Sequence, residues 1–175
     1  KKQPFDILFV IDRSSSMEEK DMYSTRSNSY IARDGAVSEM LNGSQTGYTG
    51  RGLIPELLAL NPENQIAVIS FGGDRKHTVN KQDAQIDRDW GRNKSFVNTK
   101  AFYWNGTNYT AGLEVATDMF NKPAVKNNGH RKLMVFISDG VPTFYVDNSG
   151  VRHGDGGINW APYAKEPTRQ KIDEF

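Results

Sequence analysis

Three short apolar runs separated by long polar connections constrain the fold of this chain most. They are FDILFVI at 5–11, QIAVISF at 65–71 and KLMVFIS at 132–138. Each run is shorter than a typical helix, and its nearly continuous apolar character is typical of a strand buried on both faces. Parallel strands need long crossover connections, which are usually helical. We therefore predict an α/β fold of three layers, in which a doubly wound, mostly parallel sheet carries helices on both faces.

The connections between the runs contain the expected helices. Apolar periodicity predicts helices over 30–41, 53–60 and 110–121, with Thr110 as a candidate cap of the last, and a further helix from Pro162 onward. Segments rich in Gly, Asn and Asp predict loops over 42–52 and 143–161. The polar stretch 72–102 fits either an edge strand with a short helix or a surface insertion. We expect one domain over residues 1–175.

Composition excludes several classes of function. The chain has 175 residues, with 22 Lys and Arg against 21 Asp and Glu, so the balance of charge gives no reason to expect a nucleic-acid partner. It has no Cys, which excludes disulfides, thiol catalysis and Cys-ligated metals. No apolar run approaches the roughly 20 residues of a membrane-spanning helix, so we expect no membrane insertion in this segment.

Polar side chains with hard oxygen ligands follow two of the predicted strands. Asp12, Ser14 and Ser16 come directly after the first run, and Asp139 follows the third. A third polar segment, NGTNYT at 105–110, precedes a predicted helix. Ligands of α/β sheets bind beyond the carboxyl ends of the strands. Hydroxyl and carboxylate oxygens suit Mg²⁺, Mn²⁺ or Ca²⁺ better than Zn²⁺.

Each segment taken alone also has a purely structural interpretation. Ser16 and Glu19 have the spacing of a helix capping box, and Asp139-Gly140 is typical of a turn after a strand. The three segments together favour a metal site.

These segments, DRSSSM, GTNYT and FISDG, resemble a von Willebrand factor A domain with a metal-ion-dependent adhesion site. The resemblance covers about residues 5–142. It implies that Ser14, Ser16 and Thr107 contact the cation directly, and that Asp12 and Asp139 act directly or through water. It also implies that a Glu or Asp of a protein partner completes the octahedron.

The resemblance implies an adhesion module rather than an enzyme. Apparent insertions at about 18–29 and 73–102, together with the lack of Cys, resemble Gram-positive surface and pilus-tip adhesins. This similarity implies an extracellular location on the cell wall or pilus, and a partner in the host extracellular matrix or a host receptor. The family has further strands after the one that precedes Asp139, for which residues 140–175 barely suffice, so we expect the domain to be truncated at its C-terminus.

Two other functions remain open at this point. One is an intracellular scaffold of the same family that works with an AAA+ ATPase, and the other is a metal-assisted phosphoesterase. His77, His130 and His153 are expected to be solvated surface residues, and no G-x-S-x-G nucleophile motif occurs, so catalysis lacks its usual groups. The candidates for electrostatic guidance of a partner are Arg13, Arg26 and Arg33. The candidates for contacts with a partner around the metal site are the aromatic residues Tyr48, Phe102, Tyr103, Trp104 and Tyr109.

Overall fold

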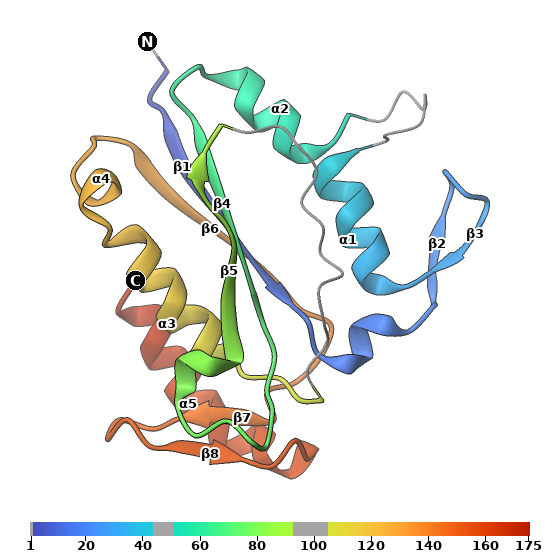
Figure 1. Cartoon of the computed structure of the whole chain (residues 1–175), viewed down its shortest axis with the longest axis vertical. Helices are drawn as coiled ribbons and strands as arrows, with labels where there is room; N and C mark the ends of the chain where they lie inside the picture. Colours follow the sequence, from blue (N-terminus) through green and yellow to red (C-terminus); the bar gives the residue numbers. More distant parts are fainter. Residues whose placement is uncertain (1, 44–50, 93–104) are drawn as a thin grey trace.

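The centre of the molecule is a four-stranded sheet in the order β5-β4-β1-β6 (Figure 1). The computed structural model describes residues 2–43, 51–92 and 105–175. The strands of the sheet are β1 (Phe5–Asp12), β4 (Gln65–Phe71), β5 (Ala84–Gly91) and β6 (Arg131–Ile137). β1 pairs in parallel with β4 and β6, whereas β5 runs antiparallel to β4. The three apolar runs thus form the mostly parallel sheet that the sequence predicts.

Alternation along the buried strands divides the core into one cluster on each face of the sheet. Ile7, Phe9 and Ile11 of β1 point to one face, and Leu8 and Val10 point to the other. All five are at most 1% exposed. Because both faces of β1 are covered, the molecule has the three layers expected for a doubly wound fold.

Helices cover the two faces of the sheet as predicted (Figure 1). On one side lie α1 (Arg33–Asn42) and α2 (Leu53–Leu60), and on the other lie α3 (Tyr109–Phe120), α4 (Pro123–Lys126) and α5 (Ala161–Asp173). Asn108, not Thr110, caps α3, because its side chain accepts a hydrogen bond from the backbone of Ala111 at 3.1 Å. The cap prediction was therefore wrong by two residues.

Two small hairpins depart from the sequence prediction. β2 (Met22–Ser24) pairs with β3 (Ser29–Ile31), so the helix predicted over 30–41 begins only at Arg33. β7 (Phe144–Val146) pairs with β8 (Arg152–Gly154) inside the stretch predicted as a loop. Short 3-10 helices are η1 (Ser15–Glu18), η2 (Asn80–Asp83) and η3 (Ile158–Trp160). η2 and β5 match the edge-strand alternative for the described part of 72–102.

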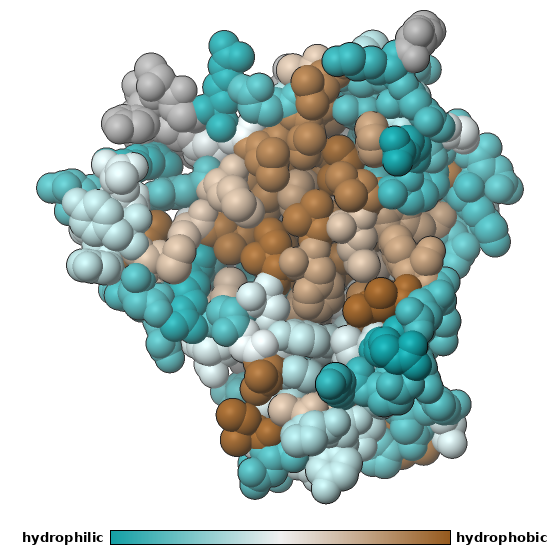
Figure 2. Space-filling model, turned by 180° about the vertical axis from the view of Figure 1, so that it is seen from behind, coloured by the Kyte–Doolittle hydropathy of each residue, from teal (hydrophilic) through white to brown (hydrophobic). Residues whose placement is uncertain are grey.

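The outer edge of β6 is exposed and apolar. Within the described ranges, β1 is the one strand that pairs with β6. Figure 2 shows an apolar patch on this side of the molecule. It includes a groove of about 200 Å³ lined by Phe5, Leu57, Leu60 and Leu133, of which Leu133 is 41% exposed. None of the described helices has the length and apolar character needed to cross a bilayer.

A buried carboxylate ties the strands together at the opposite end from their carboxyl termini. Asp6 accepts hydrogen bonds from Lys132, Gln65 (2.8 Å) and Asn128 (2.9 Å), and His130 Nδ1 lies 2.7 Å from its Oδ1. Burial raises the pKa of Asp6, but these hydrogen bonds, above all that from Lys132, outweigh burial and hold the pKa below its usual value. The charged form of Asp6 therefore stabilises the fold.

Replacement Asp6→Asn should reveal this stabilisation through its dependence on pH. At neutral pH the loss of the charge should cost about 2 kcal/mol of the free energy of unfolding, as for a hydrogen bond to a charged group. The folded pKa of Asp6 is lowered, so its contribution is complete above the unfolded value of 3.8 and is lost as the pH falls through the folded value. Urea denaturation from neutral to acidic pH should therefore show wild type and variant converging.

The matched control is Asp118→Asn, which removes an exposed carboxylate paired with Lys81 and should change the free energy of unfolding little. A difference between wild type and Asp6→Asn that persisted at the lowest pH would contradict the assignment.

Candidate metal centre

Three polar segments meet at the carboxyl edge of the sheet, the lower end in Figure 1. Asp12 ends β1, and Asp139 follows the neighbouring parallel strand β6. Gly73, just after β4, forms a bridge with Gly106, which brings the segment 105–110 to the same edge. The topology therefore places the predicted metal segments together because β1 lies between β4 and β6.

Four of the five predicted ligands form one hydrogen-bonded cluster. The backbone N–H of Ser14 donates to Asp12 Oδ1 at 2.7 Å. The hydroxyls of Ser14 and Ser16 are 3.1 Å apart, and Ser16 Oγ donates to Asp139 Oδ1 at 2.9 Å. The carboxylates of Asp12 and Asp139 are thus connected through the backbone N–H of Ser14 and the hydroxyls of Ser14 and Ser16.

Ser138 and Tyr109 support this cluster, a role that the sequence did not predict for them. Ser138 Oγ donates to Asp12 Oδ2 at 2.6 Å and lies 2.9 Å from the hydroxyl of Tyr109. The Tyr109 hydroxyl also donates to the carbonyl of Gly140. The signal in the sequence was the position of Ser138 at the strand end directly before Asp139. Tyr109, a candidate partner contact, is half-buried and supports the candidate site through its hydrogen bonds with Ser138 and Gly140.

The electrostatics of Asp12 favour a cation beside it. Asp12 is fully buried, and burial raises its pKa above the usual value, with the charge of Asp139 acting in the same direction. Hydrogen bonds from Ser138 and Ser14 act in the opposite direction without cancelling the effect of burial. A nearby positive charge would stabilise both carboxylates.

The donor atoms of the cluster fit a hard divalent cation. Carboxylate and hydroxyl oxygens are the ligands that Mg²⁺, Mn²⁺ and Ca²⁺ prefer. In the ranges that the structure describes, no three His, Asp or Glu side chains gather as a metal-binding group. The candidate centre consists of two carboxylates and neutral hydroxyls, and these ligands suit Mg²⁺ better than Zn²⁺.

Thr107 lies at the same edge but outside the hydrogen-bonded cluster. Its carbonyl accepts from the N–H groups of Thr143 (2.8 Å) and Phe144 (3.0 Å), and its own N–H donates to Thr143 Oγ1 at 2.9 Å. Gly106 allows this close packing, because a Cβ there would overlap the Phe144 ring. Among the described residues, no hydrogen bond joins Thr107 to Asp12, Ser14, Ser16 or Asp139.

A buried polar network fixes the segment that carries Thr107. Asp83 Oδ2 accepts from Asn108 Nδ2 (2.8 Å) and Arg152 Nε (2.7 Å), and His77 Nδ1 lies 2.8 Å from the other carboxylate oxygen. Arg152 also stacks over Phe144, with its guanidinium carbon 4.2 Å from the ring centroid. The network thus joins the β7–β8 hairpin to the start of α3.

The fold agrees with a comparison of sequence families. A model of the von Willebrand factor type A domain matches residues 7–141, which include all five predicted ligands. The chain belongs to the von Willebrand factor type A (VWA) domain family. A comparison with curated protein sequences gave no significant match.

Solved structures share the fold of this VWA domain at low sequence identity. The pilus adhesin SpaC from Lactobacillus rhamnosus GG, in a structure described as an open conformation, is 22% identical with a TM-score of 0.54. That match covers 89% of this chain and 18% of SpaC, so the chain spans about a fifth of the adhesin's length. The SpRpn10 VWA domain is 15% identical with a TM-score of 0.50, over 77% of this chain and 58% of that one.

Several residues of the VWA domain that were expected on the surface are buried or half-buried. Arg13 is fully buried, so the expectation that it guides a partner was wrong. His77, His130 and His153 are half-buried beside carboxylates at 2.7–2.8 Å rather than freely solvated. The candidate contacts Tyr48, Phe102, Tyr103 and Trp104 lie outside the described residues.

The Asp83–Arg152 pair predicts a large loss of stability on truncation. The side chain of Arg152 is 6% exposed and that of Asp83 is fully buried. Arg152→Met should lower the free energy of unfolding by about 3 to 5 kcal/mol, because it leaves a buried carboxylate without its main counter-charge. Urea denaturation at neutral pH measures this change.

Arg169→Met is the matched control, since Arg169 also pairs with carboxylates but is 60% exposed. Its cost should stay below about 1 kcal/mol. Equal losses in the two variants would show that the network does not anchor the β7–β8 hairpin.

Proposed function

We propose that this VWA domain is a cation-dependent adhesion module that binds a carboxylate of a protein partner. The observation that carries the proposal is the hydrogen-bonded cluster of Asp12, Ser14, Ser16 and Asp139 at the carboxyl edge of the sheet. Thr107 at the same edge supplies the fifth ligand in this proposal. The family membership supports a protein-binding module, and the cluster supports its dependence on a cation.

The proposed ligands would hold a cation while leaving part of its positive charge uncompensated. Ser14, Ser16 and Thr107 offer neutral oxygens, and Asp12 and Asp139 offer the two negative charges. A bound Mg²⁺, or Mn²⁺ or Ca²⁺, supplies a partly uncompensated positive charge that attracts an anionic ligand from outside. Ser138 and Tyr109 hold Asp12 in place while this happens.

The partner in this proposal is a protein that presents an Asp or Glu side chain, such as a component of the host extracellular matrix or a host receptor. This role implies an extracellular location on the cell wall or pilus. The similarity in fold to the pilus adhesin SpaC is consistent with that location. No nucleic acid and no bilayer takes part in the proposed interaction.

A role in catalysis has less support than adhesion. Metal-assisted phosphoester hydrolysis usually needs a general base near the cation. The three His side chains each lie against Asp6, Asp83 or Asp147, none of which is a predicted ligand. We therefore propose a binding function rather than an enzymatic one.

Replacement Asp12→Asn should weaken cation binding at least about tenfold, because it removes one of the two charges of the site. Calorimetric titration of Mg²⁺ into chelator-treated protein measures the change, and one site is expected in the wild type. The matched control Asp89→Asn removes an exposed carboxylate paired with Lys122 and should leave the titration unchanged. Magnesium affinity that survived Asp12→Asn would show that the site is elsewhere.

The adhesion step needs a second readout. Beads coated with the domain should adhere to at least one immobilised matrix protein in Mg²⁺, lose adhesion in chelator, and lose it with Asp12→Asn. Adhesion that persisted in chelator would contradict the proposed mechanism and favour a scaffold role like that of VWA domains partnered with AAA+ ATPases.

A further inference from the structure

Arg33, the first residue of α1, connects one candidate metal ligand to a hairpin beside the site. Its Nη1 donates to Asp139 Oδ2 at 2.6 Å. Its Nε donates to Asp21 Oδ1 at 2.9 Å, and its Nη2 donates to Glu19 Oε2 at 3.2 Å. One guanidinium thus holds three carboxylates, of which only Asp139 belongs to the candidate centre.

Of the three ion pairs of Arg33, the one with Asp139 is the least exposed to solvent. The side chain of Asp139 is 12% exposed, whereas those of Asp21 and Glu19 are 51% and 64% exposed. Exposed ion pairs contribute little because water and salt screen them. Of the three ion pairs of Arg33, the one with Asp139 is therefore the least screened by solvent.

Asp139 is shared between Arg33 and the metal cluster. Its Oδ1 accepts from Ser16, and its Oδ2 accepts from Arg33. Asp12 lies in the same cluster, fully buried and without an ion pair of its own in the described ranges. Within the described part of the chain, Arg33 is therefore the positive charge that pairs with a carboxylate of the candidate site.

We propose that Arg33 is an internal counter-ion of the cation site, which holds Asp139 when no cation is bound and competes with the cation for that carboxylate. The inference rests on the proposed cation site. A divalent cation beside Asp139 repels the guanidinium, so part of the attraction between cation and carboxylate is spent on that repulsion. Removing the guanidinium should therefore destabilise the metal-free protein and tighten cation binding.

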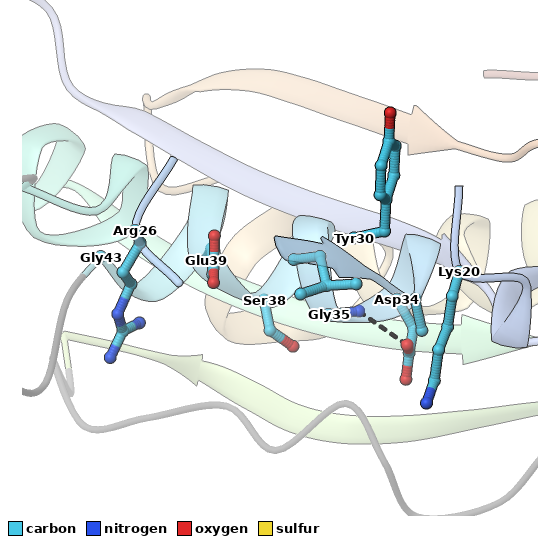
Figure 3. A pocket seen from close by; sticks show the side chains of 10 residues that line it. Lys20, Arg26, Tyr30, Asp34, Gly35, Ser38, Glu39 and Gly43 are labelled. Atoms are coloured by element: carbon cyan, nitrogen blue, oxygen red, sulfur yellow. Dashed lines mark hydrogen bonds between the residues drawn. The ribbon is translucent and has the colours of Figure 1, made fainter. Parts of the chain in front are cut away.

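The guanidinium keeps other partners when its hold on Asp139 loosens. Asp21 and Glu19 directly precede the β2–β3 hairpin, and both accept hydrogen bonds from Arg33. The hairpin and α1 border a hollow of about 480 Å³ lined by Lys20, Tyr30 and Glu39 among others (Figure 3). Ser24 Oγ donates to Glu39 at 2.9 Å, which attaches the hairpin to α1 independently of Arg33. Arg33 can thus lose its hydrogen bond to Asp139 while the hairpin stays attached to α1.

Arg33→Gln tests the inference through two measurements on the whole chain. Scanning calorimetry in chelator should show a lower melting temperature than wild type. Titration of Mg²⁺ alone should show a dissociation constant about fivefold lower than wild type, the order expected for a partly screened ion pair. Arg33→Lys keeps the charge but lacks the planar fork, so its magnesium affinity should lie between those of wild type and Arg33→Gln.

Lys20→Gln is the matched control, because it removes the same charge from the residue between Glu19 and Asp21. In the part of the chain that the structure describes, no ion pair joins Lys20 to Asp139, so its magnesium affinity should change little. Equal tightening in Lys20→Gln and Arg33→Gln would overturn the inference, since a general field would then explain both. Unchanged or weaker magnesium binding by Arg33→Gln would also overturn it.

The failure of this inference can be distinguished from failure of the cation site. If wild type binds Mg²⁺ through Asp12 and Arg33→Gln binds it equally well, the role of Arg33 alone is wrong. If neither wild type nor Arg33→Gln binds Mg²⁺, both proposals are wrong. Binding by Arg33→Gln but not by wild type would support the competition in its strongest form.

Discussion

The parallel pairing of β1 with both β4 and β6 is the constraint on which the candidate centre depends. Parallel strands end at the same edge, so the chain leaves β1 and β6 side by side at Asp12 and Asp139. The bridge between Gly73 and Gly106 then adds the segment of Thr107 to that edge. No local preference of these polar residues could gather them, because they lie far apart in sequence. Burial of the apolar strands supplies the free energy that does so.

That free energy also offsets the cost of placing charge in the interior. Asp12, Asp83 and Asp6 are all fully buried, and their charges are compensated in two different ways. Asp6 and Asp83 have Lys or Arg partners within the fold. Asp12 has hydroxyl and backbone donors, and its pKa is raised where that of Asp6 is lowered. Of Asp12 and Asp6, the carboxylate whose pKa burial leaves raised is thus the one at the predicted cation site.

The sequence predicts those features that local patterns encode. β1, β4 and β6 follow from continuous apolar runs, and the helix at 53–60 follows from apolar periodicity. The cluster of Asp12, Ser14, Ser16 and Asp139 follows from the positions of these residues after strands. The two hairpins were missed because polar contacts distant in sequence hold them, such as Arg152 with Asp83. The support of Asp12 by Ser138 was missed for the same reason: a hydrogen bond between strands leaves no periodic signal.

Both hairpins are tied to the carboxyl edge by an arginine, yet the two ties differ in kind. The Arg152 side chain is 6% exposed and bonds a carboxylate outside the predicted ligand set. The Arg33 side chain is 25% exposed and bonds a carboxylate within that set. A buried ion pair is costly to break, whereas a partly exposed guanidinium that has other acceptors nearby can change partners. The β7–β8 hairpin is therefore held firmly beside Thr107. The attachment of the β2–β3 hairpin is the one that can respond to a change of charge at the site.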